Sequence, residues 1–523
     1  MKLNFSELSE TNTVKSKMVE IELPSAPLRY YRHGWQSWSL AAWTDLSQPL
    51  SIQKPYILHP YQTDAVYSLE NDPHGSWLGA VEFSDGKIIF LGALSTDTHV
   101  FLKGDRLEGR SEAGEAEWFC AHGEEDQIFG EYAALLRNRF GSTSKSTSPR
   151  VWCSWYGFYS YINEKNLQQT IDMLGDLPFD VIQIDDGWQK DIGDWEPNEK
   201  FPSGMAATAE KIKATGRTAG LWLAPLLISN SSKLFADHKD WVVKDDKGQY
   251  VTTGFNVWGH DIYTLDVTHP DVVSWLVDLM NRVRRWGFDY IKMDFLYGGA
   301  MKGNRYLPTP REQAFRETLD KIRKALGDDA YLLACGVPIL PALGVCDAIR
   351  VGPDVSHKWE DHLFETILQN FSTPSARNGI RTVSNRLWLK PLVHVDPDVE
   401  YFVEKENELE EEHKSQLRDL ALICEFKATG DLPQWMTSSE REIIREFLTA
   451  TPKIEKVGRY RYKIDGRTVD FSEAVKLVPP PKGFALLLRS FIGWAGNFKT
   501  IFNLFLALDN AEKKRRIGKH HLN

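Results

Sequence analysis

Tyr290-Ile-Lys-Met-Asp-Phe295 and Arg350-Val-Gly-Pro-Asp354 decide the fold of this 523-residue sequence. Each stretch begins in a short apolar run typical of a buried strand and reaches a carboxylate where that run ends. The segment between them alternates helix and strand signals, which favours parallel strands joined by helices. In a β/α barrel the C-terminal ends of the strands face one pocket, so we expect Asp294 and Asp354 to meet there.

The same alternation extends from Val151 to about Pro433. Val181–Ile184 and Ala219–Leu223 have the pattern of strands, and Pro270 and Gly287 have the positions of a helix start and stop. Six strand–helix units can be counted, with room for eight. A doubly wound sheet would alternate similarly, but the glycine-rich nucleotide motifs of such folds are missing. The sequence therefore predicts an α/β fold, a (β/α)8 TIM barrel.

The regions on either side of the barrel have the pattern of β-structure. Trp77–Phe83 and Lys87–Leu91, joined by Ser84-Asp-Gly86, predict a hairpin in an N-terminal antiparallel β-sandwich. Tyr460–Gly466 and Thr468–Phe471 predict a hairpin in a small C-terminal domain that we expect to be β. With the polar linker 142–148 as a boundary, the expected domains are 1–145, 146–433 and 434–523.

Composition and charge exclude several classes of protein. A formal net charge of −10 argues against a nucleic-acid binder. Five scattered cysteines without CxxC spacing disfavour a disulfide framework or a structural zinc site. The first residues lack a signal-peptide core, which favours a cytoplasmic enzyme. The chain has 18 Trp; most should fill the core, but some are expected to stack on sugar rings.

The two carboxylates suggest a glycosidase-type pair. Lys292 and Asp294 share one side of their strand, so the ammonium should lower the pKa of Asp294 and keep it an anionic nucleophile. Asp354 should be kept protonated as the acid by burial or by anionic Asp294. Arg350 would oppose this if it touched Asp354, so we expect it to contact sugar hydroxyls. Alternatively, each Asp alone could cap a helix or pair with its basic neighbour.

Asp185-Asp186-Gly-Trp188 follows another predicted strand. Burying two adjacent carboxylates is costly unless hydrogen-bond donors, such as sugar hydroxyls, pair with them. The alternative is an exposed turn in which one Asp caps a helix. Trp188 and Trp222 are the first candidates for aromatic platforms. Cys335, at the end of a further strand, is either a pocket wall or a small core residue.

Six motifs taken together resemble glycoside hydrolase family 36 of clan D, and are most similar to its shorter, bacterial-type α-galactosidases. They occur in family order along the barrel: Trp152-Cys-Ser-Trp-Tyr156, Gln183-Ile-Asp-Asp-Gly-Trp188, Gly220-Leu-Trp-Leu-Ala-Pro225, Tyr290-Ile-Lys-Met-Asp-Phe295, Ala334-Cys-Gly336 and Arg350-Val-Gly-Pro-Asp354.

The resemblance implies roles for individual residues. Asp294 matches the nucleophile, Asp354 the acid/base, and Asp185 and Asp186 the carboxylates that hold the galactose O4 and O6 hydroxyls. The other residues implied at the sugar subsite are Lys292, Arg350, Cys335, Trp222, Trp155 and Tyr156, with Trp35 or Trp38 reaching over the pocket from the N-terminal domain.

The expected function is hydrolysis of terminal α-D-galactosides such as melibiose or raffinose-type sugars by retaining double displacement, without metal or cofactor. The expected partner is therefore a small oligosaccharide, with no nucleic acid or membrane, and a homo-oligomer is compatible with this reading. Alternatives are galactosyl transfer as in raffinose synthases, α-N-acetylgalactosaminidase activity, a metal-dependent lyase or isomerase using Asp185, Asp186 and Asp294, and a catalytically inactive sugar-binding protein.

The tail from about Pro479 departs from the family pattern. Its apolar stripe, followed by the basic run Lys513–Arg516, could lie on a membrane surface, but packing against the chain's own domains is favoured. The stripe consists of Phe498, Ile501, Phe502, Phe505 and Leu506.

Overall fold

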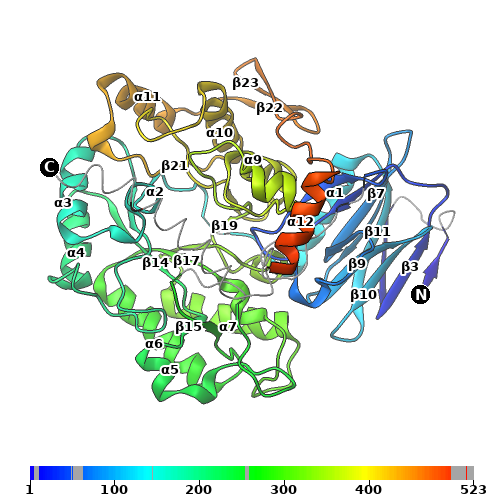
Figure 1. The fold of residues 1–523 in the computed structure, drawn as a ribbon, viewed down its shortest axis with the longest axis horizontal. Helices are drawn as coiled ribbons and strands as arrows, with labels where there is room; N and C mark the ends of the chain where they lie inside the picture. The colour runs from blue at the N-terminus through cyan, green and yellow to red at the C-terminus, as the bar shows by residue number, and fades with distance from the viewer. Residues whose placement is uncertain are drawn as a thin grey trace.

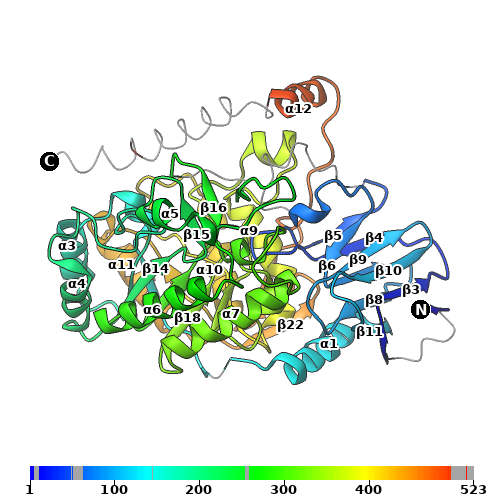
Figure 2. The same cartoon turned by 90° about the horizontal axis from the view of Figure 1, so that it is seen from below.

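The computed structural model describes residues 1–4, 11–48, 50, 63–143, 145–253, 258–495 and 514. An N-terminal pair of mainly antiparallel sheets lies to one side of a β/α barrel in both views (Figures 1 and 2). A small sheet and a helix, α12 (Phe484–Ala495), follow the barrel in the chain. In Figure 1, α12 lies in front of the junction between the barrel and the sandwich.

The N-terminal region is a sandwich of a five-stranded and a six-stranded sheet. The predicted hairpin is formed by β7 and β8, which pair antiparallel. The first sheet has the order β1 (Lys2–Leu3), β3 (Met18–Glu22), β10 (Arg106–Ser111), β9 (Thr98–Lys103) and β6 (His74–Ser76). The second has the order β2 (Thr11–Ser16), β11 (Ala116–Gly123), β8 (Ile88–Ala93), β7 (Leu78–Glu82), β4 (Arg29–Arg32) and β5 (Ala42–Asp45).

The central region is a curled sheet of eight parallel strands, so the predicted barrel is confirmed. Its seam is bridged beyond β20, where Glu400 N donates to Ala428 O at 2.9 Å and Glu400 Oε2 accepts Ala428 N at 2.9 Å. The strands are β12 (Val151–Cys153), β13 (Val181–Ile184), β14 (Thr218–Leu223), β17 (Tyr290–Met293), β18 (Tyr331–Ala334), β19 (Ala348–Arg350), β20 (His394–Asp396) and β21 (Ala428–Thr429).

Helices connect these strands and cover the outside of the sheet (Figure 1). Asn163 caps α3 in a capping box with Asn166, and Pro270 occupies the first turn of α6, which ends at Gly287 with φ 97°. The larger helices are α3 (Glu164–Leu174), α4 (Gly204–Lys213), α6 (Pro270–Trp286), α7 (Arg311–Leu326), α9 (Ala376–Ser384) and α10 (Glu411–Cys424). Shorter elements are α2 (Trp155–Phe158), β15 (Leu227–Ser229), α5 (Lys233–Asp237), β16 (Ile262–Thr264), η6 (Leu296–Ala300), α8 (Ile339–Ala342), η7 (His362–Ile367) and η8 (Leu387–Leu389).

The sandwich and the barrel share one hydrophobic core. Helix α1 (Glu125–Phe140) leads from the sandwich to the barrel, and its Phe129 and Tyr132 pack near Trp388 in η8. The same core continues into the C-terminal sheet through Tyr462 and Ile464. These parts are therefore packed against one another as a continuous body.

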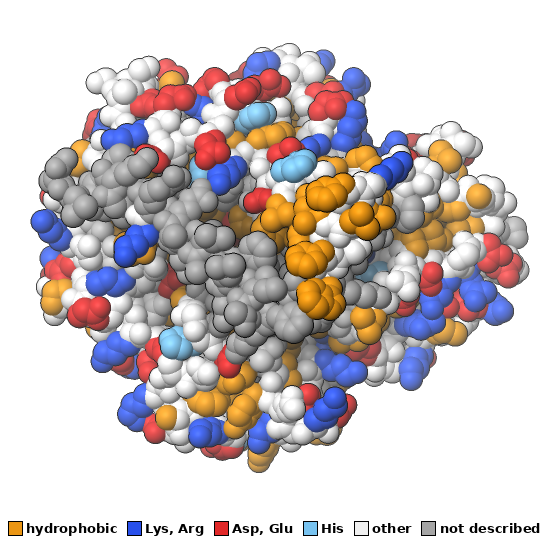
Figure 3. Space-filling view, viewed as in Figure 1, with side chains coloured by type: hydrophobic (Ala, Val, Ile, Leu, Met, Phe, Trp, Pro, Cys, Tyr) orange, Lys and Arg blue, Asp and Glu red, His pale blue; other side chains and the backbone are white. Residues whose placement is uncertain are grey.

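The C-terminal region is mixed rather than purely β. Helix α11 (Ser438–Thr449) precedes an antiparallel sheet of β22 (Ile454–Gly458), β23 (Arg461–Ile464) and β24 (Arg467–Asp470). The side chains of Phe484, Leu487, Phe491 and Trp494 on α12 are exposed and form an apolar patch (Figure 3).

The apolar stripe and basic run expected further along the tail lie outside the described residues, apart from Lys514. Within the described ranges, none of the helices has both the length and the apolar character needed to cross a membrane.

Candidate active site

Asp294 follows β17 directly and is held by neighbouring donors. Its Oδ2 accepts the indole N–H of Trp222 at 2.9 Å, and its Oδ1 accepts the backbone N–H of Phe295 at 2.9 Å. Phe295 has a left-handed backbone with φ 52°, a sparsely populated conformation that functional sites often contain. The carboxylate is thus buried with one donor on each oxygen.

Lys292 lowers the pKa of Asp294, as expected, but the effect of burial is larger and the net shift is upward. Burial raises the pKa of Asp294 to about 6; Lys292 and Trp222 act against that rise, and Asp354 and Asp185 add to it. Lys292 Nζ itself forms an ion pair with Asp185 Oδ2, at 2.9 Å. Asp294 is still an anion for the most part above about pH 6.

Asp185 and Asp186 are buried after β13 and make different contacts. Asp185 Oδ2 also accepts Gln183 Nε2 at 2.6 Å, so this carboxylate is bound mainly by the protein. Asp186 accepts Gln189 Nε2 at 2.6 Å and Trp258 Nε1 at 2.9 Å, and burial raises its pKa. The alternative of an exposed turn at this pair is excluded by their burial.

Arg350 contacts Asp354, contrary to the expectation that it would face sugar hydroxyls. Arg350 ends β19, and its Nη1 lies 3.1 Å from Asp354 Oδ1. Its two other nitrogens face Asp396 and Asp398, so buried carboxylates surround the guanidinium on several sides. Asp354 itself is the more open of the two predicted catalytic carboxylates, with 36% of its side chain exposed.

Asp396 and Asp398 were missed in the sequence, as was Trp258. Asp398 accepts the phenol of Tyr156, so the hydroxyl of this candidate binding residue is already used within the protein. The signal was present: Asp396-Pro-Asp398 comes where the apolar strand β20 ends, the same pattern that identified Asp294 and Asp354. Trp258 lies in a long loop segment with no such pattern.

The predicted aromatic residues divide into two groups. Trp222 lies beside Asp294, but Trp188 is wrong as a platform because it is fully buried, donates its indole N–H to Trp222 O at 3.0 Å and packs against Trp195 and Trp286. Trp155 is half-buried at the start of α2, after β12, with an edge contact to Tyr159.

The two N-terminal tryptophans are in different places. Trp38 packs edge-on against Phe295 with ring centroids 5.0 Å apart, which brings the sandwich to the residue after Asp294. Trp35 instead donates its indole N–H to Glu312 Oε1 in α7 at 2.7 Å. Cys335 is buried at the end of β18, and burial raises the pKa of its thiol; its neighbour Gly336 contacts Trp38 and Phe295 so closely that a Cβ there would lie 3.0 Å from the Trp38 ring.

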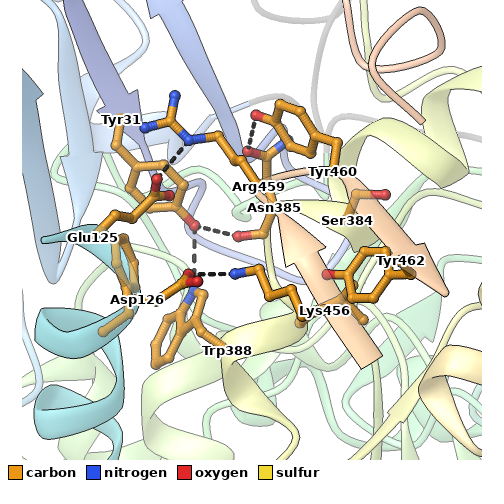
Figure 4. Close-up of a pocket in the computed structure, with 12 residues that line it drawn as sticks. Tyr31, Glu125, Asp126, Ser384, Asn385, Trp388, Lys456, Arg459, Tyr460 and Tyr462 are labelled. Carbon is orange, nitrogen blue, oxygen red and sulfur yellow. Dashed lines mark hydrogen bonds and ion pairs between the residues drawn. The ribbon is translucent and has the colours of Figure 1, made fainter. Parts of the chain in front are cut away.

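One small pocket of the molecule does not coincide with these residues. A small pocket of about 50 Å³ lies where α1, η8 and the β22–β23 hairpin meet, with Arg459 bonded to Glu125 and Lys456 to Asp126 (Figure 4). It contains none of the predicted site residues and is far below the roughly 300–1,000 Å³ of small-molecule sites. In the described part of the chain, no cluster of three or more His, Cys, Asp or Glu has the arrangement of a metal site.

The chain is similar to known α-galactosidases in sequence and in structure. The Melibiase family model matches residues 119–321. The structure of TtGalA, an alpha-galactosidase from Thermus thermophilus in complex with p-nitrophenyl alpha-D-galactopyranoside, is 39% identical with a TM-score of 0.85, covering 90% of this chain and 95% of that one. A GH36 alpha-galactosidase AgaA structure from Geobacillus stearothermophilus, 14% identical with a TM-score of 0.56, covers 82% of this chain and 61% of that one and supports the fold alone.

Curated relatives match over shorter segments. Probable alpha-galactosidase C of Aspergillus flavus is 28% identical over 180 residues, which cover 31% of this chain and 23% of the relative. The match to alpha-galactosidase AgaA of Geobacillus stearothermophilus covers 35% of this chain and 26% of that protein. The matched segments thus span about a quarter of these relatives' length.

The barrel, with carboxylates at the ends of its strands, belongs to a glycoside hydrolase. Given the match to the Thermus thermophilus protein over nine-tenths of the chain, the chain belongs to glycoside hydrolase family 36, the α-galactosidase family.

Proposed function

We propose that this protein hydrolyses terminal, non-reducing α-D-galactosyl residues of small oligosaccharides with retention of configuration. The observation that carries the proposal is the buried carboxylate of Asp294 at the end of β17, which Trp222 and Phe295 hold by hydrogen bonds. Asp354 lies close enough for its charge to raise the pKa of Asp294. A paired nucleophile and acid at the C-terminal face of a barrel is the arrangement that retaining glycosidases need.

Each residue has a defined part in the two steps. Asp294 attacks the anomeric carbon, and Asp354 gives its proton to the leaving oxygen, so that a covalent galactosyl–Asp294 ester forms and the aglycone departs neutral. Asp354, now an anion, takes a proton from water, whose oxygen attacks the same carbon and releases Asp294. The more open position of Asp354 suits a group that must reach both a leaving group and water.

The sugar would be selected by the carboxylates after β13. Asp186 has two protein donors, one on each oxygen, and each oxygen retains a lone pair for a sugar hydroxyl. Solved structures of the Thermus thermophilus relative in complex with stachyose and with p-nitrophenyl alpha-D-galactopyranoside support a galacto-oligosaccharide as the substrate class.

A panel of p-nitrophenyl α-glycosides tests the proposal. The galactoside should be cleaved with a kcat/KM at least about 100-fold above the glucoside, because a site built to bond one hydroxyl leaves its polar groups unpaired with the epimer. The panel should include the xyloside and the N-acetylgalactosaminide, and each assay should be repeated with EDTA. If the N-acetylgalactosaminide is the preferred substrate, the protein is an α-N-acetylgalactosaminidase and not an α-galactosidase. If EDTA abolishes the activity and a divalent cation restores it, a metal-dependent lyase or isomerase is favoured.

A further inference from the structure

Arg350 is shared among three carboxylates. Its Nη1 lies 3.1 Å from Asp354 Oδ1, its Nε 2.8 Å from Asp396 Oδ2, and its Nη2 2.9 Å from Asp398 Oδ1. Arg350, Asp396 and Asp398 are buried, and only Asp354 is partly open. One positive charge therefore faces three carboxylates, two of which are unable to reach solvent.

Asp398 is also tied to the backbone that carries Asp354. Its Oδ2 accepts the hydroxyl of Tyr156 and, at 2.9 Å, the N–H of Val355, the residue directly after Asp354. Asp398 N donates to Asp396 Oδ1 at 2.8 Å, and the backbone of Asp398 has φ 88°, unusual for a residue with a side chain. Tertiary contacts thus hold Asp398 in a strained conformation.

The charge of Asp398 follows from opposing effects. Burial raises its pKa, Arg350 and Tyr156 lower it, and Asp354 and Asp396 raise it further. Its Oδ2 accepts two hydrogen bonds, from Tyr156 and Val355, and its Oδ1 faces the Arg350 guanidinium, so these three contacts favour the anion against the net rise of its pKa to about 7. The other ionisable groups near Asp398 are Glu400 and Cys153.

We propose that Asp398 is a positioning residue which, together with Asp396, offsets the charge of Arg350 and thereby lets Asp354 keep the proton it donates. The inference rests on the acid/base role proposed for Asp354. A guanidinium at hydrogen-bond distance with no other counter-ion would hold Asp354 as an anion, which cannot act as the acid. Two buried carboxylates on the far side of Arg350 reduce that effect while fixing its orientation.

The variant Asp398→Asn tests the idea because it removes the charge and keeps the size. The alkaline limb of the kcat/KM profile for melibiose should move to lower pH by about one unit or more, since a neighbouring anion is lost in a low-dielectric site. An activated p-nitrophenyl α-galactoside should show a much smaller loss at the same pH, because its leaving group barely needs a proton. Asp431→Asn, a buried carboxylate that accepts only the backbone N–H groups of Phe402 and Val403, is the matched control and should leave the limb in place.

A second variant, and the same Asp398→Asn change made in an Asp354→Ala protein, test whether the effect of Asp398 acts through Asp354. Tyr156→Phe removes one donor from Asp398, favours its protonated form, and should move the same limb in the same direction by a smaller amount. In an Asp354→Ala background, Asp398→Asn should cause no shift. The inference would be overturned, with the proposed function left intact, by either of two results. One is an alkaline limb that stays in place in both Asp398→Asn and Tyr156→Phe; the other is a shift of equal size when Asp398→Asn is made in the Asp354→Ala background. A wild type that leaves every α-galactoside intact would overturn the proposed function as well.

Discussion

At the scale of single residues, Asp294 is the proposed nucleophile. The variant Asp294→Ala should lose all but a trace of turnover, because it removes the carboxylate proposed to form the galactosyl ester, and added azide should restore part of the activity and give the β-galactosyl azide. Kinetics and product NMR on p-nitrophenyl α-galactoside provide the measurement. Asp289→Ala, at the opposite end of β17 and paired with Lys213, is the matched control. Retention of more than about a tenth of the wild-type rate would contradict the assignment.

Replacing Asp354 should reduce activity by an amount that depends on the leaving group of the substrate. Asp354→Ala should lower kcat/KM for melibiose at least about 100-fold more than for p-nitrophenyl α-galactoside, because only the sugar alkoxide needs general-acid help. Steady-state kinetics with both substrates, at one pH above 6 where Asp294 is ionised, measure the ratio. Equal losses on the two substrates would be inconsistent with an acid role.

Asp186 should govern the choice of sugar. In Asp186→Asn the new amide cannot accept hydrogen bonds on both sides, so either Gln189 or Trp258 loses its acceptor along with the sugar hydroxyl. Losing one charge-assisted hydrogen bond costs about 1.5–3 kcal/mol, or roughly 10- to 100-fold in kcat/KM for galactosides. The gap to α-glucosides should narrow, with circular dichroism unchanged. If rates and ratio both stay at wild-type values, Asp186 is not a specificity residue.

The carboxylates at strand ends were predictable because a short apolar run followed by Asp is a local pattern. The partner of Lys292 was not. Lys292 and Asp294 share a strand side, yet the ammonium bonds Asp185 across β14, a choice that depends on the packing of three strands. The burial of Trp188 was not predictable for a similar reason, since Trp286, which packs against it, lies at the end of α6, far along the chain.

At the scale of elements, one buried arginine fixes the segment that carries Trp38. Arg386, just before η8, donates to the carbonyls of Gly34, Gln36, Ser37 and Val351. These bonds bind the sandwich loop 34–38 to the barrel at the point where Trp38 reaches Phe295. The arrangement makes the loop a wall of the candidate site.

Arg386→Met should therefore reduce both stability and substrate affinity. Loss of several charge-assisted bonds to buried carbonyls should lower the free energy of unfolding by more than about 2 kcal/mol, and KM for galactosides should rise because Trp38 is no longer held. Denaturant unfolding and kinetics measure the two effects. Arg316→Met, which removes bonds to the carbonyls of Pro341 and Leu343, should lower stability without changing KM. The same result for both variants would show that Arg386 has only a structural role.

The limits of individual helices were predictable from capping residues such as Asn163, Pro270 and Gly287, because these act within one turn. Contacts between elements far apart in the chain were not. Arg386 lies far along the chain from Gly34, and the sequence near either residue contains no sign of the other.

At the scale of the whole molecule, sandwich and barrel meet at a buried acid pair. Glu312, in the first turn of α7, accepts the indole N–H groups of Trp35 and Trp77 and the backbone N–H of Asp97. Asp97 in turn accepts the backbone N–H groups of Glu312 and Gln313, and so caps α7 from the sandwich. This reciprocal arrangement joins the two parts into one unit, and we expect a single calorimetric unfolding transition.

The same pair should make the stability of the molecule depend on pH. Burial, followed by the charge of Asp97, raises the pKa of Glu312 from 4.5 to about 8. The folded protein therefore holds a proton that the unfolded chain releases, so the stabilisation is complete below about pH 4.5 and is lost as pH rises through about 8. The contribution is at most about 1.4 kcal/mol per pH unit.

Glu312→Gln should lower Tm at low pH, because its amide cannot accept all three N–H groups, and should also flatten the fall of Tm between pH 5 and 8. Glu317→Gln, on the exposed face of α7, is the control and should keep the wild-type slope. A Glu312→Gln slope equal to that of the wild type would show that Glu312 does not gain a proton on folding, and that its three N–H donors hold it as a carboxylate throughout.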